Sequence, residues 1–240
     1  MRIDKLLANM GYGTRKEVKG LLRGGNVRVN GHPEKNGKTH VNPEDDSVTV
    51  MGEEVNYREY IYLMLNKPGD LISATEDAHD MTVIDILQPE DQVFAPFPVG
   101  RLDKDTEGLL LITNDGQLAH RLTTPKKDIG KTYYAVIEGV VTEEDVSKFK
   151  QGVTLDDSYI TKPADLNIIK SDQVSEIELT ITEGKFHQVK RMFEAVNKKV
   201  TYLKRIQMGS LKLDPELELG EYRELTDEEI EYLMTITKMD

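Results

Sequence analysis

A short apolar run at residues 108–113 limits what this chain can fold into, because its β-compatible residues predict a strand buried in a sheet. The Asn-Asp-Gly sequence at 114–116 predicts a tight turn that ends this strand. The segment in front of the strand, residues 100–107, is densely charged and contains Arg101 and Asp103. We therefore expect a charged loop that a packed strand holds in place.

Chain length and cysteine content narrow the class of protein. The chain has 240 residues and no cysteine. This length exceeds the usual size of one domain and favours two unequal domains. Without cysteine the chain cannot form disulfides, thiolate zinc sites or iron–sulfur clusters, and it has no cysteine nucleophile. No apolar run is long enough for a membrane span and the N-terminus lacks a secretory signal, so we expect a cytoplasmic protein.

The charge is unevenly distributed along the chain. The formal net charge is −12, which by itself disfavours a phosphate-rich partner. Residues 1–40, however, hold nine Lys and Arg against three Asp and Glu, and residues 183–213 hold eight against two. Such segregation indicates an electropositive face suited to a nucleic acid, although solvated charge without a partner would give the same counts.

The first basic segment contains a well-marked helix. Thr-Arg-Lys-Glu at 14–17 is a capping box that predicts its start, and Gly-Gly at 24–25 predicts its end. Arg15, Lys19 and Arg23 recur every four residues and form one basic stripe on this helix. The stripe is typical of a compact RNA-binding module, and a merely soluble helix is the alternative.

Polar residues 52–59 read as a linker, and residues 60–65 read as the first strand of a larger domain. Alternating runs predict further strands at 131–141, 177–181 and 201–208, and periodic patterns predict helices that start at Thr142 and span 187–196. These strands and helices do not alternate as regular βαβ units. We therefore predict an α+β fold.

The two carboxylates of the charged loop, Asp103 and Asp105, admit several chemical interpretations. They could act as a general acid/base pair, bind a metal, or be ordinary loop carboxylates. The chain shows no metal-ligand spacing, and alternation in an extended loop disfavours two neighbouring carboxylates that flank one sugar bond. A single ionised aspartate also remains open, because a nearby guanidinium would favour its charged form and keep it ready as a nucleophile.

The N-terminal segment resembles a known RNA-binding family. Arg-x-Asp-Lys-Leu-Leu at 2–7, the helix that starts at 14–17, and Val-Arg-Val-Asn-Gly at 27–31 are similar to the S4-type domain. The last of these reads as a short strand followed by a turn at 30–31. The resemblance implies that Arg15, Lys19 and Arg23 contact structured RNA.

The charged loop belongs to a second resemblance. Gly-Arg-Leu-Asp-x-x-Thr-Glu-Gly-Leu-Leu at 100–110 resembles the signature of pseudouridine synthases of the ribosomal small-subunit synthase A type. Further segments match this family in order at 65–69, 131–133 and 183–192. The resemblance implies an S4-type domain at 1–55 and a catalytic domain at 60–240, with a mixed, mainly antiparallel sheet that helices flank.

This resemblance implies an enzyme that converts a uridine of ribosomal RNA to pseudouridine with no metal and no cofactor. The uridine must flip out of the RNA, because a side chain cannot reach a glycosidic carbon inside stacked bases. We expect small-subunit RNA as the substrate and a monomer with no membrane partner. The same chemistry on large-subunit RNA and a non-catalytic RNA-binding assembly factor are the alternatives.

The resemblance also assigns residues to the reaction. Asp103 corresponds to the family's essential aspartate, which attacks C1′ of the ribose or C6 of the uracil, or assists glycal formation. Arg101 is expected to pair with this aspartate before substrate arrives and then to fill the space that the flipped uridine leaves. Tyr133 corresponds to the tyrosine that stacks on the base.

Three basic residues complete the expected site. Lys190 stands where relatives usually have an arginine that pairs with the aspartate, and it lacks the planar fork of arginine. Arg191 is the alternative partner. Lys67 is expected to position a phosphate. His187 is left out of catalysis, since a lone histidine is more often structural or an RNA contact.

Overall fold

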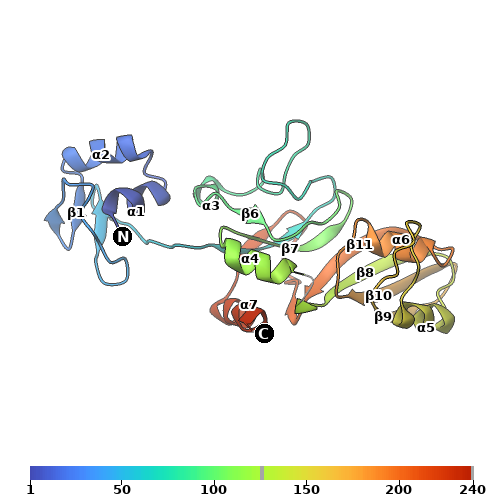
Figure 1. Ribbon diagram of the computed structural model, residues 1–240. Coiled ribbons are helices and arrows are strands. Elements are labelled where there is room, and N and C mark those ends of the chain that lie inside the picture. Colours follow the sequence, from blue (N-terminus) through green and yellow to red (C-terminus); the bar gives the residue numbers. More distant parts are fainter. Residues whose placement is uncertain (125–126, 239–240) are drawn as a thin grey trace. The chain divides into compact units, whose positions relative to one another are not determined.

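The computed structural model describes residues 1–124 and 127–238. Its strands and helices mix along the chain without regular βαβ alternation (Figure 1), which confirms the predicted α+β class. Within these described residues, no helix is both long enough and apolar enough to cross a membrane.

The chain forms two compact units. The first contains Met1–Ile61 and Leu87–Pro96, and the second contains Tyr62–Ile86 and Phe97–Asp240. The short segment at 87–96 thus belongs to the N-terminal unit although it follows the first strand of the second unit in sequence. The domain limits at 1–55 and 60–240 stay a prediction, and residues 125–126 and 239–240 of the longer range lie outside the described residues.

The first unit packs helices against a four-stranded antiparallel sheet with the order β2-β1-β3-β4. Its helices are α1 (Ile3–Asn9), α2 (Arg15–Arg23) and the short α3 (Pro89–Gln92). Its strands are β1 (Val27–Val29), β2 (His32–Pro33), β3 (Val48–Val50) and β4 (Glu53–Glu54). Its core brings together buried side chains from both long helices and the sheet, among them Ile3, Leu6, Val18, Leu22 and Val27.

Local sequence chemistry sets the bounds of α2, as predicted. The Thr14 hydroxyl accepts a hydrogen bond from the Glu17 backbone N–H at 3.4 Å, and the Glu17 carboxylate accepts one from the Thr14 N–H at 2.7 Å. The helix ends at Gly24, its C-cap residue. The predicted turn between β1 and β2 is also confirmed, because Asn30 and Gly31 both adopt positive φ, as a two-residue hairpin requires.

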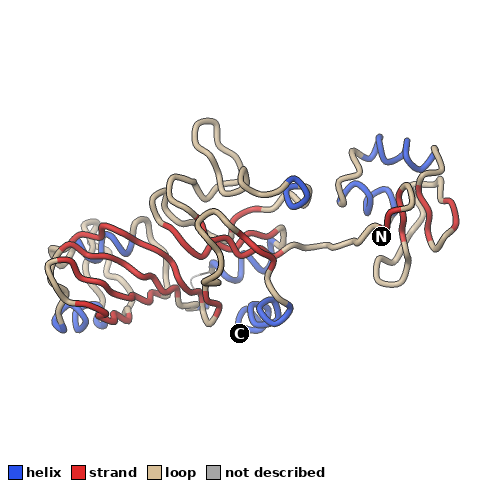
Figure 2. The backbone as a smooth tube through the Cα atoms, turned by 180° about the vertical axis from the view of Figure 1, so that it is seen from behind, coloured by secondary structure: helices blue, strands red, loops and turns tan. Residues whose placement is uncertain are grey.

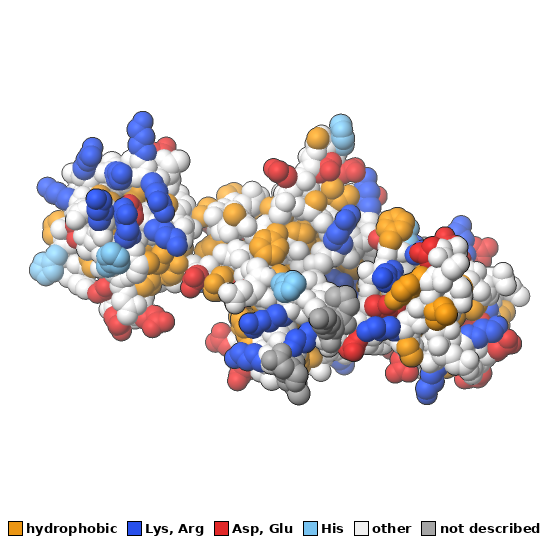
Figure 3. Space-filling view, in the orientation of Figure 1, with side chains coloured by type: hydrophobic (Ala, Val, Ile, Leu, Met, Phe, Trp, Pro, Cys, Tyr) orange, Lys and Arg blue, Asp and Glu red, His pale blue; other side chains and the backbone are white. Residues whose placement is uncertain are grey.

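One face of α2 is buried and the opposite face is basic. Arg15, Lys19 and Arg23 are all exposed, while Val18 and Leu22 enter the core. Figure 3 shows Lys and Arg side chains gathered over this part of the unit. The predicted basic stripe therefore exists as a solvent-facing surface.

The second unit is built on a mixed sheet with the order β13-β5-β7-β11-β8-β10-β9, to which β6 and β12 add at β7 and β11. The pair β7–β11 is parallel and the other pairs are antiparallel. Its strands are β5 (Tyr62–Lys67), β6 (Phe97–Pro98), β7 (Glu107–Thr113), β8 (Lys131–Glu138), β9 (Asp165–Lys170), β10 (Val174–Ile181), β11 (Lys199–Met208), β12 (Leu211–Lys212) and β13 (Tyr222–Glu224). Its helices are α4 (Gly116–Thr123), α5 (Glu143–Gln151), α6 (Gln188–Glu194) and α7 (Asp227–Lys238).

The helices α5 and α6 cover the part of the sheet formed by β8 to β11 (Figure 2). Their rings Phe149 and Phe193 are fully buried and meet edge to face, with centroids 5.0 Å apart. On the sheet, Tyr133 of β8 lies opposite Leu179 of β10, and both side chains are buried. The side of the sheet that carries Tyr133 is therefore fixed by packing.

Strand β7 lies between β5 and β11 and is buried along most of its length, as predicted. At its start, Gly108 has a φ of +98°, and a Cβ there would lie 2.2 Å from the carbonyl oxygen of Arg205. A side chain at this position would push β11 away. The Arg205 guanidinium Nε in turn donates to the Leu109 carbonyl at 2.7 Å.

The sequence at 114–116 does more than form the predicted turn. The strand ends at Thr113 as expected, but the next residues begin the helix α4, which the sequence analysis did not predict. Asp115 is its N-cap, and one carboxylate oxygen accepts hydrogen bonds at 3.0 Å from the backbone N–H groups of Gln117 and Leu118. A turn signal and a helix N-cap use the same residue types, so the pattern alone did not separate them.

Candidate active site

The loop between β6 and β7 carries Asp103 and is fixed through its backbone. The Ser73 hydroxyl donates to the Leu102 carbonyl at 2.9 Å and accepts from the Leu102 N–H at 3.0 Å. Inside the loop, the Thr106 N–H donates to the Asp103 carbonyl at 3.0 Å. These contacts hold the Asp103 backbone on a rigid support, as a reacting side chain requires.

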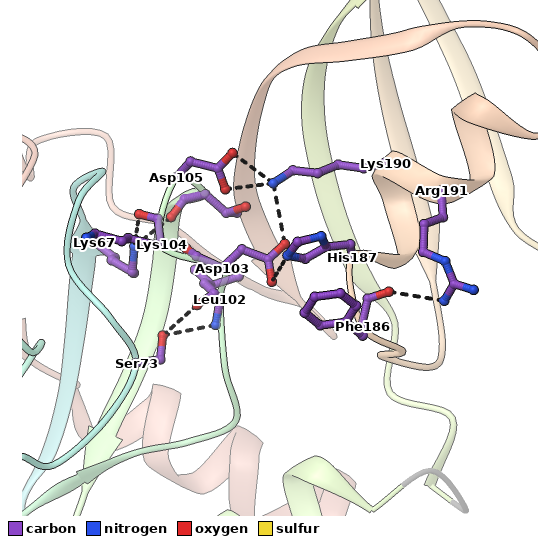
Figure 4. Close-up of polar contacts among 11 residues, drawn as sticks. Lys67, Ser73, Leu102, Asp103, Lys104, Asp105, Phe186, His187, Lys190 and Arg191 are labelled. Atoms are coloured by element: carbon purple, nitrogen blue, oxygen red, sulfur yellow. Dashed lines mark hydrogen bonds and ion pairs between the residues drawn. The ribbon is translucent and has the colours of Figure 1, made fainter. Parts of the chain in front are cut away.

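Lys67 provides the strongest of these supports, and the expectation that it positions a phosphate is wrong. The side chain is fully buried at the end of β5. Its ammonium donates to four backbone carbonyls, those of Pro68, Asp103, Lys104 and Thr106, at 2.9–3.2 Å. Figure 4 shows Lys67 directed at this loop. Burial lowers the pKa of Lys67 to about 8 despite the acidic side chains nearby.

The carboxylate of Asp103 faces two basic side chains from the start of α6. The Lys190 Nζ lies 3.6 Å from one Asp103 oxygen, and the His187 Nε2 lies 3.7 Å from the other. In Figure 4 the Asp103 side chain is directed toward both. The carboxylate is 29% exposed and thus stays open to a substrate.

Lys190 also binds the second carboxylate of the loop, and more closely. Its Nζ lies 2.6 and 2.8 Å from the two oxygens of Asp105. Burial acts to raise the pKa of Asp105, but the hydrogen bond and charge of Lys190 outweigh it and hold that pKa below its usual value. One ammonium group thus links both carboxylates, and Asp105 competes with Asp103 for it.

Arg191 points away from the loop. Its guanidinium pairs with Asp156 and Asp157, at 2.7 Å to an Asp156 oxygen from Nε and 2.8 Å to an Asp157 oxygen. These two carboxylates raise the pKa of Arg191 further. The cation beside Asp103 is therefore Lys190, because adjacent residues of a helix face directions about 100° apart.

Tyr133 and Arg101 border the same small cavity as Asp103. This cavity has a volume of about 70 Å³, and Tyr133, at 8% exposed, forms part of its wall from β8. Arg101 is exposed. The expected ion pair between Arg101 and Asp103 is absent from the described part of the chain: the two residues share the cavity without contact between their charges.

The comparisons with known proteins agree with this geometry. The family model of RNA pseudouridylate synthase matches residues 61–195, and that of the S4 domain matches residues 1–47. Together the two matches define an RNA-modifying enzyme with an S4 domain. Since the first match covers more than half of the chain, the chain belongs to the RNA pseudouridylate synthase family.

Similar proteins span the full chain. The uncharacterized RNA pseudouridine synthase YtzG of Bacillus subtilis is 56% identical over 234 residues, which cover 97% of this chain and 98% of that protein. The ribosomal small subunit pseudouridine synthase A of Vibrio parahaemolyticus is 42% identical and covers 96% of this chain and 98% of its own. A crystal structure of pseudouridylate synthase has 37% identity and a TM-score of 0.68, with 97% of this chain and 99% of that chain covered.

Sequence reasoning missed two features of this site. It left His187 aside, although this residue lies as close to Asp103 as Lys190 does. It also gave Asp105 no partner. One signal could have indicated the role of His187. It lies three positions before Lys190, and this spacing puts two residues on the same face of a helix.

Proposed function

We propose that this protein isomerises a specific uridine of small-subunit ribosomal RNA to pseudouridine, with Asp103 as the reacting group. The observation that carries this proposal is the Asp103 carboxylate in a cavity beside Tyr133, on a loop whose backbone is anchored by Lys67 and Ser73. The choice of small-subunit RNA is supported by the names of relatives that are 40–42% identical. A ribosomal RNA substrate also favours a cytoplasmic location.

The reaction needs the glycosidic bond of a flipped uridine next to Asp103. The carboxylate attacks C1′ or C6, or it assists formation of a glycal. The N1–C1′ bond breaks, the base turns, and a C5–C1′ bond forms, while C5 loses a proton and N1 gains one. Flipping costs a few kcal/mol, which contacts to the extruded nucleotide must offset. Tyr133 lies where it can pack against the base, and exposed Arg101 can enter the space left in the RNA.

Lys190 and His187 set the electrostatics of the reacting carboxylate. Contacts with a nearby ammonium limit the orientations that a carboxylate adopts. Because Lys190 also binds Asp105 at 2.6 Å, it can approach Asp103 more closely only if that contact lengthens. Asp105 thereby acts as a positioning residue for Lys190.

The exposed basic face of α2 supports docking of the first unit on structured RNA. Arg15, Lys19 and Arg23 present three cations along one helix face. Such phosphate contacts give affinity without reading sequence. Selectivity for one uridine then comes from RNA shape and unpaired bases.

Asp103→Asn tests the proposal most directly. The change removes the reacting carboxylate at nearly constant volume, so pseudouridine in transcribed small-subunit RNA should fall below detection while RNA affinity changes less than about threefold. Asp105→Asn is the matched control, and we expect it to keep at least about a tenth of the activity. Mass spectrometry of RNA digests measures the product. Full activity of Asp103→Asn would refute its assigned role.

A further inference from the structure

Phe186 exposes an aromatic ring beside the catalytic loop. The residue lies between β10 and α6 and is 75% exposed. Its ring stacks on the imidazole of His187, with centroids 3.7 Å apart and planes inclined by 19°. Large apolar side chains normally leave water when a chain folds. A phenyl ring that keeps the face away from His187 in solvent is therefore suited to a partner.

The loop that presents this ring is fixed by a buried carboxylate. Glu183, at 5% exposed, accepts hydrogen bonds from the Tyr159 hydroxyl at 2.6 Å, the Gln188 amide at 2.7 Å and the Lys162 N–H at 2.9 Å. The Gln188 side chain also accepts from the Lys185 N–H at 2.8 Å. The backbone on both sides of the aromatic pair is thus held by satisfied polar contacts, so the exposure of the ring does not come from a loose loop.

The aromatic pair lies at the reacting carboxylate. His187 Nε2 is 3.7 Å from an Asp103 oxygen, and both aromatic residues line, together with Asp103, a cavity of about 500 Å³. Lys185 and Arg101 border the same cavity. Proteins that bind single-stranded RNA combine cations, which suit phosphates, with an aromatic face, which suits a base. This cavity has both beside the Asp103 carboxylate.

Base flipping creates the need for such a face. When a nucleotide leaves the stack, the adjoining base loses a stacking partner, and an aromatic side chain can replace it. We propose that Phe186, supported from behind by His187, stacks on the nucleobase adjacent to the flipped uridine. This proposal rests on the pseudouridine synthase activity proposed above. Stacking accepts any base, so the pair selects an unpaired neighbour rather than a particular nucleotide.

The test uses the full-length protein with transcribed small-subunit ribosomal RNA. Stacking on one base is worth about 5- to 100-fold in affinity, so Phe186→Leu should raise KM by this factor while kcat changes less than about threefold. Phe186→Tyr, which keeps the π face, should stay within about threefold of the parent. Ile169→Ala removes another apolar side chain, 52% exposed on β9, and is the matched control with no expected effect.

A second measurement reads stacking directly. A single-stranded uridine 12-mer with one central 2-aminopurine should lose fluorescence on binding to the parent protein and to Phe186→Tyr, and should keep it with Phe186→Leu. An unchanged KM and unchanged quenching for Phe186→Leu would overturn the proposed stacking by Phe186. Equal losses of affinity and of quenching in Phe186→Leu and Phe186→Tyr would overturn it too. If the parent protein makes no pseudouridine, the proposed function fails instead, and the quenching measurement still decides whether Phe186 binds a base.

Discussion

Two lysines contact the catalytic loop from opposite sides and use their charge in different ways. Lys67 is fully buried and binds backbone carbonyls of the loop, including that of Asp103. Lys190 is partly exposed and binds the side chains of Asp103 and Asp105. The contacts of Lys67 depend on the backbone path of the loop. The contacts of Lys190 depend on which side chains the loop carries.

Lys67 therefore positions the loop, whereas Lys190 acts on the side chain that is proposed to react. A backbone carbonyl cannot be changed by mutation, so the Lys67 anchor sets the place of the loop whatever residues occupy it. Lys190 contacts the side chain of Asp103, the carboxylate proposed to react. We therefore expect substitution of Lys67 to affect both stability and activity, and substitution of Lys190 to affect activity almost alone.

Of the substitutions at the two lysines, Lys67→Met should have the larger effect on both stability and rate. The methionine fills similar space but leaves the carbonyl oxygens that Lys67 binds without a donor, at a cost of about 1–3 kcal/mol in the free energy of unfolding. A loop displaced by about 1 Å loses on the order of 100-fold in rate. Urea denaturation and single-turnover assays measure the two quantities. A variant with parental stability would show that the anchor is dispensable.

Lys190→Gln should reduce kcat about 10- to 100-fold and change the free energy of unfolding by less than about 0.5 kcal/mol, because partly exposed ion pairs contribute little to stability. Arg191→Gln is its control, since that guanidinium pairs with Asp156 and Asp157 instead. We expect the control to keep kcat within about threefold. Equal losses in both variants would mean that the cations act through overall charge, not through contact with Asp103.

The pH dependence of stability gives the most specific effect. The pKa of Lys67 is about 8 in the folded protein, and the pKa of a lysine in the unfolded chain is about 10.5, so between these pH values the unfolded chain binds more protons than the folded one. The free energy of unfolding of the parent, relative to Lys67→Met, should therefore rise from pH 8 to pH 10, by at most about 1.4 kcal/mol per pH unit. Parallel stability curves for the two proteins would show that Lys67 keeps an ordinary pKa.

Features set by neighbouring residues could be predicted from the sequence. The capping box at Thr14, the hairpin turn at Asn30 and the apolar strand β7 depend on residues a few positions apart, and all three are present. The ordered motifs also identified the family. The placement of Tyr133 beside Asp103 agrees with its expected position, and both roles remain proposals.

Features set by distant parts of the chain could not be predicted. A lysine before a proline and glycine reads as exposed, and only the arrival of the loop at 103–106 makes Lys67 a buried donor. The choice between Lys190 and Arg191 depends on the rotation of α6 and on Asp156 and Asp157, over 30 residues away in sequence. Periodicity and local propensity carry no information on such contacts.

The close approach of Gly108 to Arg205 has a consequence for synthesis of the chain. The strand β7 follows the catalytic loop directly, and its parallel neighbour β11 comes much later in the sequence, with Gly108 paired to Arg205. A nascent chain emerging from the ribosome cannot complete the active site until residues 199–208 are free to pair. The site around Asp103 is therefore complete only after β11 has been synthesised and has paired with β7.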